Sequence, residues 1–225
     1  MKLFLSGGGS GLDSMELDKK YIQSLDLSKP VLYIPIAINT EKHPYSGCLA
    51  WIKDNFKPLG FENFVMWTED DLRKKTENDF KEFGGIYIGG GNTFKLLKEL
   101  KEFGTFNIIK KFANGNVPIY GGSAGAGILA RTVIPALSAD LNDVGLADFS
   151  ALNLLNDYDI WCHYKGTMDE EIYRYIKKYN LKKIIAIPEN AGLCVTESLI
   201  EVVGPSGVFV FLADKKKEAT PGSLI

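Results

Sequence analysis

The segment VPIYGGSAG at residues 117–125 decides the expected fold. Its first four residues are mostly apolar, a run of small residues follows, and a second small and apolar stretch occupies 126–130. This order predicts a buried strand, a tight turn and a helix. In open α/β sheets such turns lie at the carboxyl ends of the strands, where ligands bind.

Short apolar segments alternate with longer amphipathic segments along the rest of the chain. The pattern predicts strands at 3–5, 30–37, 64–67, 86–88 and 117–120, and helices within 46–56, 94–100, 108–112 and 168–179. Four further short strands, at 184–187, 193–195, 199–203 and 208–212, predict a C-terminal β-meander that closes the sheet. We therefore expect a single domain, residues 1–225, folded as a three-layer α/β/α sandwich with a mostly parallel sheet. The charged runs at 70–75 and 215–218 are expected to be solvated loops.

The composition excludes several classes of protein. The chain has 26 basic and 28 acidic residues in 225, a net charge of -2, so bulk electrostatics gives it no attraction to nucleic acid or to a membrane surface. Cys48, Cys162 and Cys194 are few and widely spaced, which favours reduced thiols over a disulfide framework. The apolar stretch at the N-terminus is too short for a signal peptide, and no segment is long enough for a membrane helix. A cytoplasmic location is expected.

Three glycine runs follow predicted strands, at 7–9, 89–91 and 121–125. The first run lacks the third glycine of a dinucleotide fingerprint, because Leu12 stands there, and the second predicted strand ends in Ala37-Ile38-Asn39 instead of the expected acid. A P-loop motif is absent. No His-x-x-x-His pair offers a metal site. We expect neither a cofactor nor a metal.

Ser123 lies at the centre of Gly-x-Ser-x-Gly, the sequence of a nucleophile elbow. Small neighbours are needed because the nucleophile sits on a tight turn with its oxygen exposed. The N–H of Ala124, at the start of the helix, would then stabilise an oxyanion. The alternative is a glycine turn with a capping serine. The run at 89–91 would supply a second oxyanion donor, and Asn92 or Thr93 would cap the next helix.

A serine nucleophile needs a base, and the chain has two histidines, His43 and His163. His43 lies in a polar loop, whereas His163 lies at the end of a predicted strand downstream of the serine, so His163 is the expected base. The spacing of residues in the sequence does not identify the acid that orients this histidine. Asp140, Asp143 and Asp148 follow the elbow, and Asp157 and Asp159 lie near His163 but would flank it on the same strand.

Three motifs resemble a known family: YIGGGNTF at 87–94, GSAG at 122–125 and IPEN at 187–190. Together they closely resemble dipeptidase E and its cyanophycinase relatives, which are serine peptidases on a class I glutamine-amidotransferase-like sandwich. The resemblance covers the whole chain. It implies a triad of Ser123, His163 and Asp140, with Asp143 beside Asp140 as an alternative acid. The implied oxyanion donors are the backbones of Gly90 and Ala124.

The resemblance also implies a substrate, a short peptide, and residues that bind it. Dipeptidase E holds an N-terminal aspartate with an arginine in the helix after the catalytic histidine, but here Asp169 occupies that position, so aspartyl preference is in doubt. Arg174, one turn further on, is the candidate replacement. The expected substrate-binding residues are Gly89, Gly91, Asn92, Arg174 and, for the free amine, Glu189. Amidotransferase activity is disfavoured, because the elbow carries serine rather than cysteine and His163 is followed by Tyr164-Lys165.

The expected function is hydrolysis of dipeptides through an acyl-enzyme on Ser123. An esterase or amidase with the same triad is the alternative among enzymes, and a binding protein with a degenerate site is the alternative outside them. We expect a small peptide as the only partner, without nucleic acid or membrane. The sequence leaves the oligomeric state open.

Overall fold

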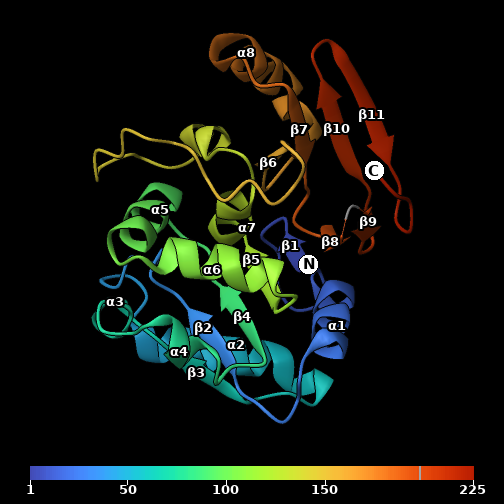
Figure 1. Ribbon diagram of the computed structural model, residues 1–225. Helices are drawn as coiled ribbons and strands as arrows, with labels where there is room; N and C mark the ends of the chain where they lie inside the picture. Colours follow the sequence, from blue (N-terminus) through green and yellow to red (C-terminus); the bar gives the residue numbers. More distant parts are fainter. Residues whose placement is uncertain (198) are drawn as a thin grey trace.

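The computed structural model describes residues 1–197 and 199–225, whose strands form two sheets (Figure 1). The larger sheet has seven strands in the order β3-β2-β4-β5-β1-β8-β9. The first five strands of that order are parallel, and β8 and β9 are antiparallel. Their bounds are β1 Lys2–Ser6, β2 Val31–Ile34, β3 Phe64–Met66, β4 Gly85–Ile88, β5 Pro118–Gly122, β8 Gly192–Thr196 and β9 Leu199–Val203. The mostly parallel sheet expected from the sequence is confirmed.

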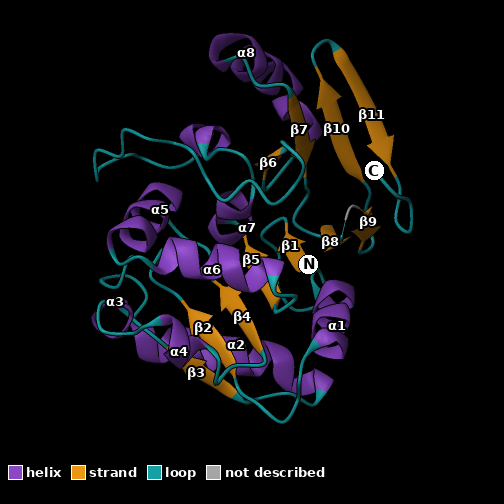
Figure 2. Ribbon diagram, viewed as in Figure 1, coloured by secondary structure: helices purple, strands orange, loops and turns teal. Residues whose placement is uncertain are grey.

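Helices cover both faces of this sheet, which makes three layers (Figure 2). One face packs aromatic side chains, among them Phe4 and Tyr120, against α1 and α2. The other face, which includes Leu3 and Leu5, packs against α5, α6 and α7. Neighbouring residues of one strand thus enter different cores, as the period of two in a strand requires. The helices are α1 Met15–Ser24, α2 Tyr45–Phe56, α3 Glu69–Leu72, α4 Glu77–Phe80, α5 Thr93–Glu102, α6 Thr105–Asn114, α7 Ala124–Leu129 and α8 Asp169–Tyr179.

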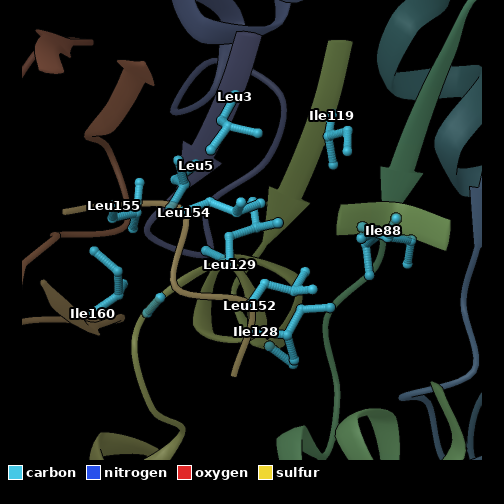
Figure 3. Packing of buried hydrophobic residues seen from close by; sticks show 14 of the residues in the cluster. Leu3, Leu5, Ile88, Ile119, Ile128, Leu129, Leu152, Leu154, Leu155 and Ile160 are labelled. Atoms are coloured by element: carbon cyan, nitrogen blue, oxygen red, sulfur yellow. The ribbon is translucent and has the colours of Figure 1, made fainter. Parts of the chain in front are cut away.

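The core beneath the centre of the sheet joins segments that are far apart in the sequence. Figure 3 shows Leu3, Leu5 and Ile119 from the central strands beside Ile128 and Leu129 of α7. Leucines of the irregular segment 152–155 complete this cluster, and Leu152 and Leu155 are almost fully buried. The short helix α7 is therefore fixed between the sheet and this segment.

The second sheet has four strands in the order β11-β10-β7-β6. They are β6 Asp159–Trp161, β7 Lys183–Ala186, β10 Val208–Leu212 and β11 Lys215–Ala219, and they lie with α8 beside the large sheet (Figure 1). The C-terminal strands therefore do not form one meander: β8 and β9 extend the large sheet, and β7 and β10 pair in the other.

The charged run at 215–218 is also a strand, not a loop. Its backbone pairs with β10, from Leu212 opposite Lys215 to Val208 opposite Ala219. Lys216 Nζ lies 4.4 Å from the ring centroid of Phe209 and 2.7 Å from an oxygen of Asp169. Backbone pairing and these contacts stabilise the strand, although its sequence lacks the apolar residues that usually indicate one. Lysine is common on edge strands. The run at 70–75 likewise overlaps α3, which begins with a capping box from Thr68 and Asp71.

Three 3₁₀ helices complete the regular structure: η1 Lys57–Leu59, η2 Ile134–Ser138 and η3 Gly166–Met168. In residues 1–197 and 199–225, no helix has both the length and the apolar character needed to span a bilayer.

Candidate active site

Ser123 lies on the sharp turn between β5 and α7. Its backbone has φ 49° and ψ -107°, a conformation that costs energy for any residue with a side chain. Gly125 makes the turn possible, since a Cβ at this position would lie 2.2 Å from the carbonyl oxygen of Ile88. The strained turn presents the serine oxygen above the carboxyl end of the sheet, as a nucleophile elbow does.

His163 faces Ser123 from the second sheet. The Ser123 Oγ and His163 Nε2 atoms are 2.7 Å apart, a hydrogen-bond distance. His163 lies two residues beyond β6 with φ 54°, and its N–H donates to the carbonyl of Gly7 at 2.8 Å. The glycine run at 7–9 packs against its ring: a Cβ on Gly8 would lie 2.1 Å from Cε1. This run therefore supports the imidazole.

Glu189 lies at the other ring nitrogen of the histidine. Its Oε1 lies 2.9 Å from His163 Nδ1. The two residues meet because β6 and β7 are parallel, with Trp161 opposite Ala186, so the segments that follow both strands leave the same edge. The sequence-based expectation for Glu189 was a contact with the substrate amine. The sequence did place the IPEN motif directly after a predicted strand, a position from which Glu189 could reach a catalytic histidine. It did not show that this strand pairs with the strand before His163.

Asp140, the acid implied by the family resemblance, lies elsewhere. Its Oδ2 accepts a hydrogen bond of 2.8 Å from the N–H of Thr93, at the start of α5. This site suits a carboxylate, because free N–H groups and the helix dipole favour negative charge there. Among the described residues, the acid that the structure brings to His163 is Glu189, and not Asp140.

The other candidate acids also lie away from the imidazole. Asp148 binds Lys101 at 2.7 Å, and hydrogen bonds from Lys101 and Ser150 lower its pKa to about 2. Asp159 is fully buried and accepts hydrogen bonds from Thr132. Asp143 lines a separate hollow beside Asn92, and Asp157 binds Asn153.

The two expected oxyanion donors flank Ser123. Ala124 is the first residue of α7, so its N–H has no acceptor within the helix. Gly90 lies opposite, where a Cβ would come within 3.3 Å of the Ser123 Cβ. Gly91 lines the same side of the site, whereas Gly89 packs near Tyr33.

Asn92 caps α5, because its side chain accepts a hydrogen bond from the N–H of Lys95 at 2.9 Å. It also donates to the carbonyl of Leu141. The Asn92 side chain is thus hydrogen-bonded to its own helix and to the loop that carries Asp140. It lines a hollow next to the serine site.

The residues proposed to hold a substrate aspartate do not face Ser123. Asp169 Oδ1 accepts a hydrogen bond of 2.6 Å from the Tyr164 hydroxyl, and Asp169 Oδ2 accepts one from Lys216 at 2.7 Å. Arg174 is largely exposed and lies 3.8 Å from Glu171 on its own helix. Neither Asp169 nor Arg174 lines a hollow beside the serine.

Two hollows meet at Ser123. We call the first the aromatic hollow; it measures about 480 Å³ and is lined by Tyr33, Trp51, Tyr87, Lys42 and His43, with Ile38, Pro44, Gly47 and Cys48. We call the second the acidic hollow; it measures about 390 Å³ and is lined by small and apolar residues of 124–139, by 160–163 and by Asp140. Gly8 and Gly90 line both.

Cys162 is not placed to act as a nucleophile. Cys162 lies behind the elbow, and its Sγ is 3.5 Å from the carbonyl oxygen of Ser123. Burial, and then the negative charge of Asp140, raise its pKa to about 12, so the thiol stays protonated. In the described part of the chain, no group of three or more His, Cys, Asp or Glu side chains is arranged to hold a metal ion.

Comparison with known proteins gives a family match over most of the chain. The profile of peptidase family S51 matches residues 3–203. The chain is 26% identical over 149 residues to peptidase E of Shewanella sp. strain W3-18-1, a match that covers 63% of this chain and 62% of the relative. It is 28% identical over 200 residues, 83% of this chain and 77% of the relative, to a Drosophila melanogaster protein named for alpha-aspartyl dipeptidase activity.

Solved structures show the same fold. A protein from Listeria monocytogenes EGD-e, described as peptidase E, superposes with a TM-score of 0.67 at 24% identity and covers 91% of this chain and 98% of its own. A peptidase from an acI-B1 Actinobacterium superposes with a TM-score of 0.69 at 19% identity and covers 100% of this chain and 96% of its own. The family resemblance and the fold class expected from the sequence are confirmed.

Proposed function

The chain belongs to peptidase family S51, and from this premise we propose that it hydrolyses short peptides with Ser123, His163 and Glu189 as its triad. The observation that carries the proposal is the continuous chain from Ser123 Oγ through both ring nitrogens of His163 to Glu189 Oε1, with steps of 2.7 and 2.9 Å. The match covers 62% of the length of the curated Shewanella relative. The name of that relative, peptidase E, therefore supports the proposal, but the activity of this chain is argued from its own site.

The proposed reaction begins with proton transfer from Ser123 Oγ to His163 Nε2. The serine oxygen attacks the substrate carbonyl, and the N–H groups of Gly90 and Ala124 bind the resulting oxyanion. His163 then gives its proton to the leaving amine, the C–N bond breaks, and an acyl-enzyme remains. Water, deprotonated by His163, attacks this ester and releases the acid and the serine. Glu189 keeps Nδ1 protonated and stabilises the imidazolium.

The size of the site favours short substrates. The hollows on the two sides of Ser123 measure about 480 and 390 Å³, which suits one residue on each side of the scissile bond. The site offers no support for aspartyl preference, since the position of the family arginine is taken by Asp169, whose carboxylate binds Tyr164 and Lys216. We therefore assign dipeptide hydrolysis without that preference.

Ser123→Ala tests the proposal. We expect the variant to lose turnover of a dipeptide panel by a factor on the order of 10³ or more, with an unchanged thermal midpoint. The matched control is Ser28→Ala, a serine in the exposed loop between α1 and β2. A fluorophosphonate probe should label the wild-type protein and Ser28→Ala, but not Ser123→Ala. Wild-type turnover in Ser123→Ala would contradict the triad, and labelling without hydrolysis of any dipeptide would favour an esterase.

A further inference from the structure

The two hollows at Ser123 differ in charge. The aromatic hollow is bordered by the cationic side chain of Lys42 and by His43, and the residues described along its wall include no carboxylate. The acidic hollow is bordered by Asp140, and its described wall includes no lysine or arginine. A dipeptide carries an ammonium at one end and a carboxylate at the other, so this asymmetry favours one orientation across the serine.

Asp140 is able to receive the ammonium. Its Oδ2 accepts the Thr93 N–H, and within the described chain Oδ1 accepts no hydrogen bond. The residue is partly exposed and lines the acidic hollow. An ammonium at Oδ1 would form a charge-assisted hydrogen bond. The rest of the described wall consists of small, apolar and hydroxyl side chains with His163, and it provides no lysine or arginine for a second acidic group in the N-terminal residue.

The aromatic hollow suits a large side chain. Tyr33 and Tyr87 meet edge to face at its floor, with ring centroids 5.6 Å apart, and both are almost fully buried. Trp51, at the rim, is 42% exposed, which is unusual for so large an apolar residue. Edge or stacked contacts between aromatic rings are favourable, so an aromatic or large apolar side chain of the substrate would bind in this hollow.

These observations extend the proposed function and rest on it. We infer that the preferred substrate is a dipeptide with an uncharged N-terminal side chain and an aromatic or large apolar C-terminal residue. Its ammonium lies at Asp140 in the acidic hollow, and its carboxylate lies near Lys42 and His43 at the rim of the aromatic hollow. The scissile carbonyl then faces Gly90, Ala124 and Ser123 between them.

The test compares kcat/KM for Ala-Phe, Ala-Gly, Asp-Phe, Ala-Phe amide and N-acetyl-Ala-Phe. We expect Ala-Phe to exceed Ala-Gly at least tenfold, a factor that burial of one large side chain readily supplies. Removing the carboxylate, acetylating the amine, or placing aspartate first should each lower the value. Asp-Phe equal to or better than Ala-Phe would overturn the inference.

Variants connect these preferences to the residues. Lys42→Gln should lower the ratio of Ala-Phe to Ala-Phe amide about five- to tenfold, whereas Lys110→Gln, an exposed lysine of α6, should leave the ratio unchanged. Gly47→Leu should narrow the aromatic hollow, because Gly47 lines it and a Cβ there meets only Pro44, at 4.0 Å, and it should lower the ratio of Ala-Phe to Ala-Gly. Thermal midpoints check that both variants fold.

The possible failures are distinguishable. Ser123-dependent hydrolysis of Ala-Gly and Ala-Phe at equal rates would overturn the inference and leave the proposed function standing. An equal ratio of Ala-Phe to Ala-Phe amide in Lys42→Gln and Lys110→Gln would also overturn the inference and leave the proposed function standing. If no dipeptide is hydrolysed in a Ser123-dependent way, the proposed function itself fails.

Discussion

The two sheets contribute different halves of the site. The large sheet supplies Ser123 and, beside it, the backbone N–H groups of Gly90 and Ala124, all at turns that follow β4 and β5. The second sheet supplies His163 and Glu189, which follow β6 and β7. The first half depends on backbone geometry and small residues, and the second on a pair of side chains. The proposed catalytic step therefore depends on how the second sheet is held against the first.

The glycine run at 7–9 is a contact between the halves, so a change there should have the largest effect among changes outside the proposed triad. Gly8→Ala places a Cβ 2.1 Å from Cε1 of His163 at a residue with φ 118°. We expect the imidazole to shift away from Ser123 and kcat to fall by a factor on the order of 10².

The control is Gly11→Ala. Gly11 also has a positive φ, 61°, but a Cβ there meets no atom within 4 Å. This variant should keep its kcat even if it loses some stability. If the two variants had equal kcat, the run would not position the histidine.

The two sheets should also differ, more modestly, in their response to pH. Burial raises the pKa of Asp18, beneath the large sheet, to about 6, against the hydrogen bonds from Ser14 and Tyr120. The folded state therefore holds this proton more tightly than the unfolded chain, and its contribution to stability falls as the pH rises from about 4 to about 6. Asp18→Asn should remove that fall, on the order of 1 to 3 kcal/mol in the free energy of unfolding.

Asp169, at the second sheet, should show the opposite sign. Partial burial raises its pKa, but hydrogen bonds from Lys216 and Tyr164 outweigh that effect and lower it overall. Its contribution is present above the unfolded pKa and is lost as the pH falls through the folded pKa. Urea titrations of wild type and Asp18→Asn at pH 4.5 and 7.5 measure the first effect, and titrations of wild type and Asp169→Asn at about pH 2.5 and about pH 5 measure the second. A steeper loss of stability with rising pH in Asp18→Asn would contradict this account.

Sequence patterns predicted the large sheet better than the second one. The elbow at Ser123 and the glycine turn at Gly90 are local features, and each is fixed by residues next to it in the chain. The pairing of β6 with β7 is not local, and it brings Glu189 to His163 across 26 residues. Asp140 followed from the order of the family motifs, but its carboxylate instead faces the start of α5. Likewise β11 could not be predicted from an apolar pattern. Its neighbours stabilise it through backbone pairing and through Lys216.

We propose that Glu189, and not Asp140, orients His163. The most direct measurement is kcat of Glu189→Gln and Asp140→Asn, purified side by side with thermal midpoints, on one dipeptide. We expect Glu189→Gln to lower kcat by a factor on the order of 10² to 10⁴, because the amide no longer stabilises the imidazolium. We expect Asp140→Asn to act mainly on KM. A loss of kcat in Asp140→Asn with near-normal kcat in Glu189→Gln would contradict this proposal.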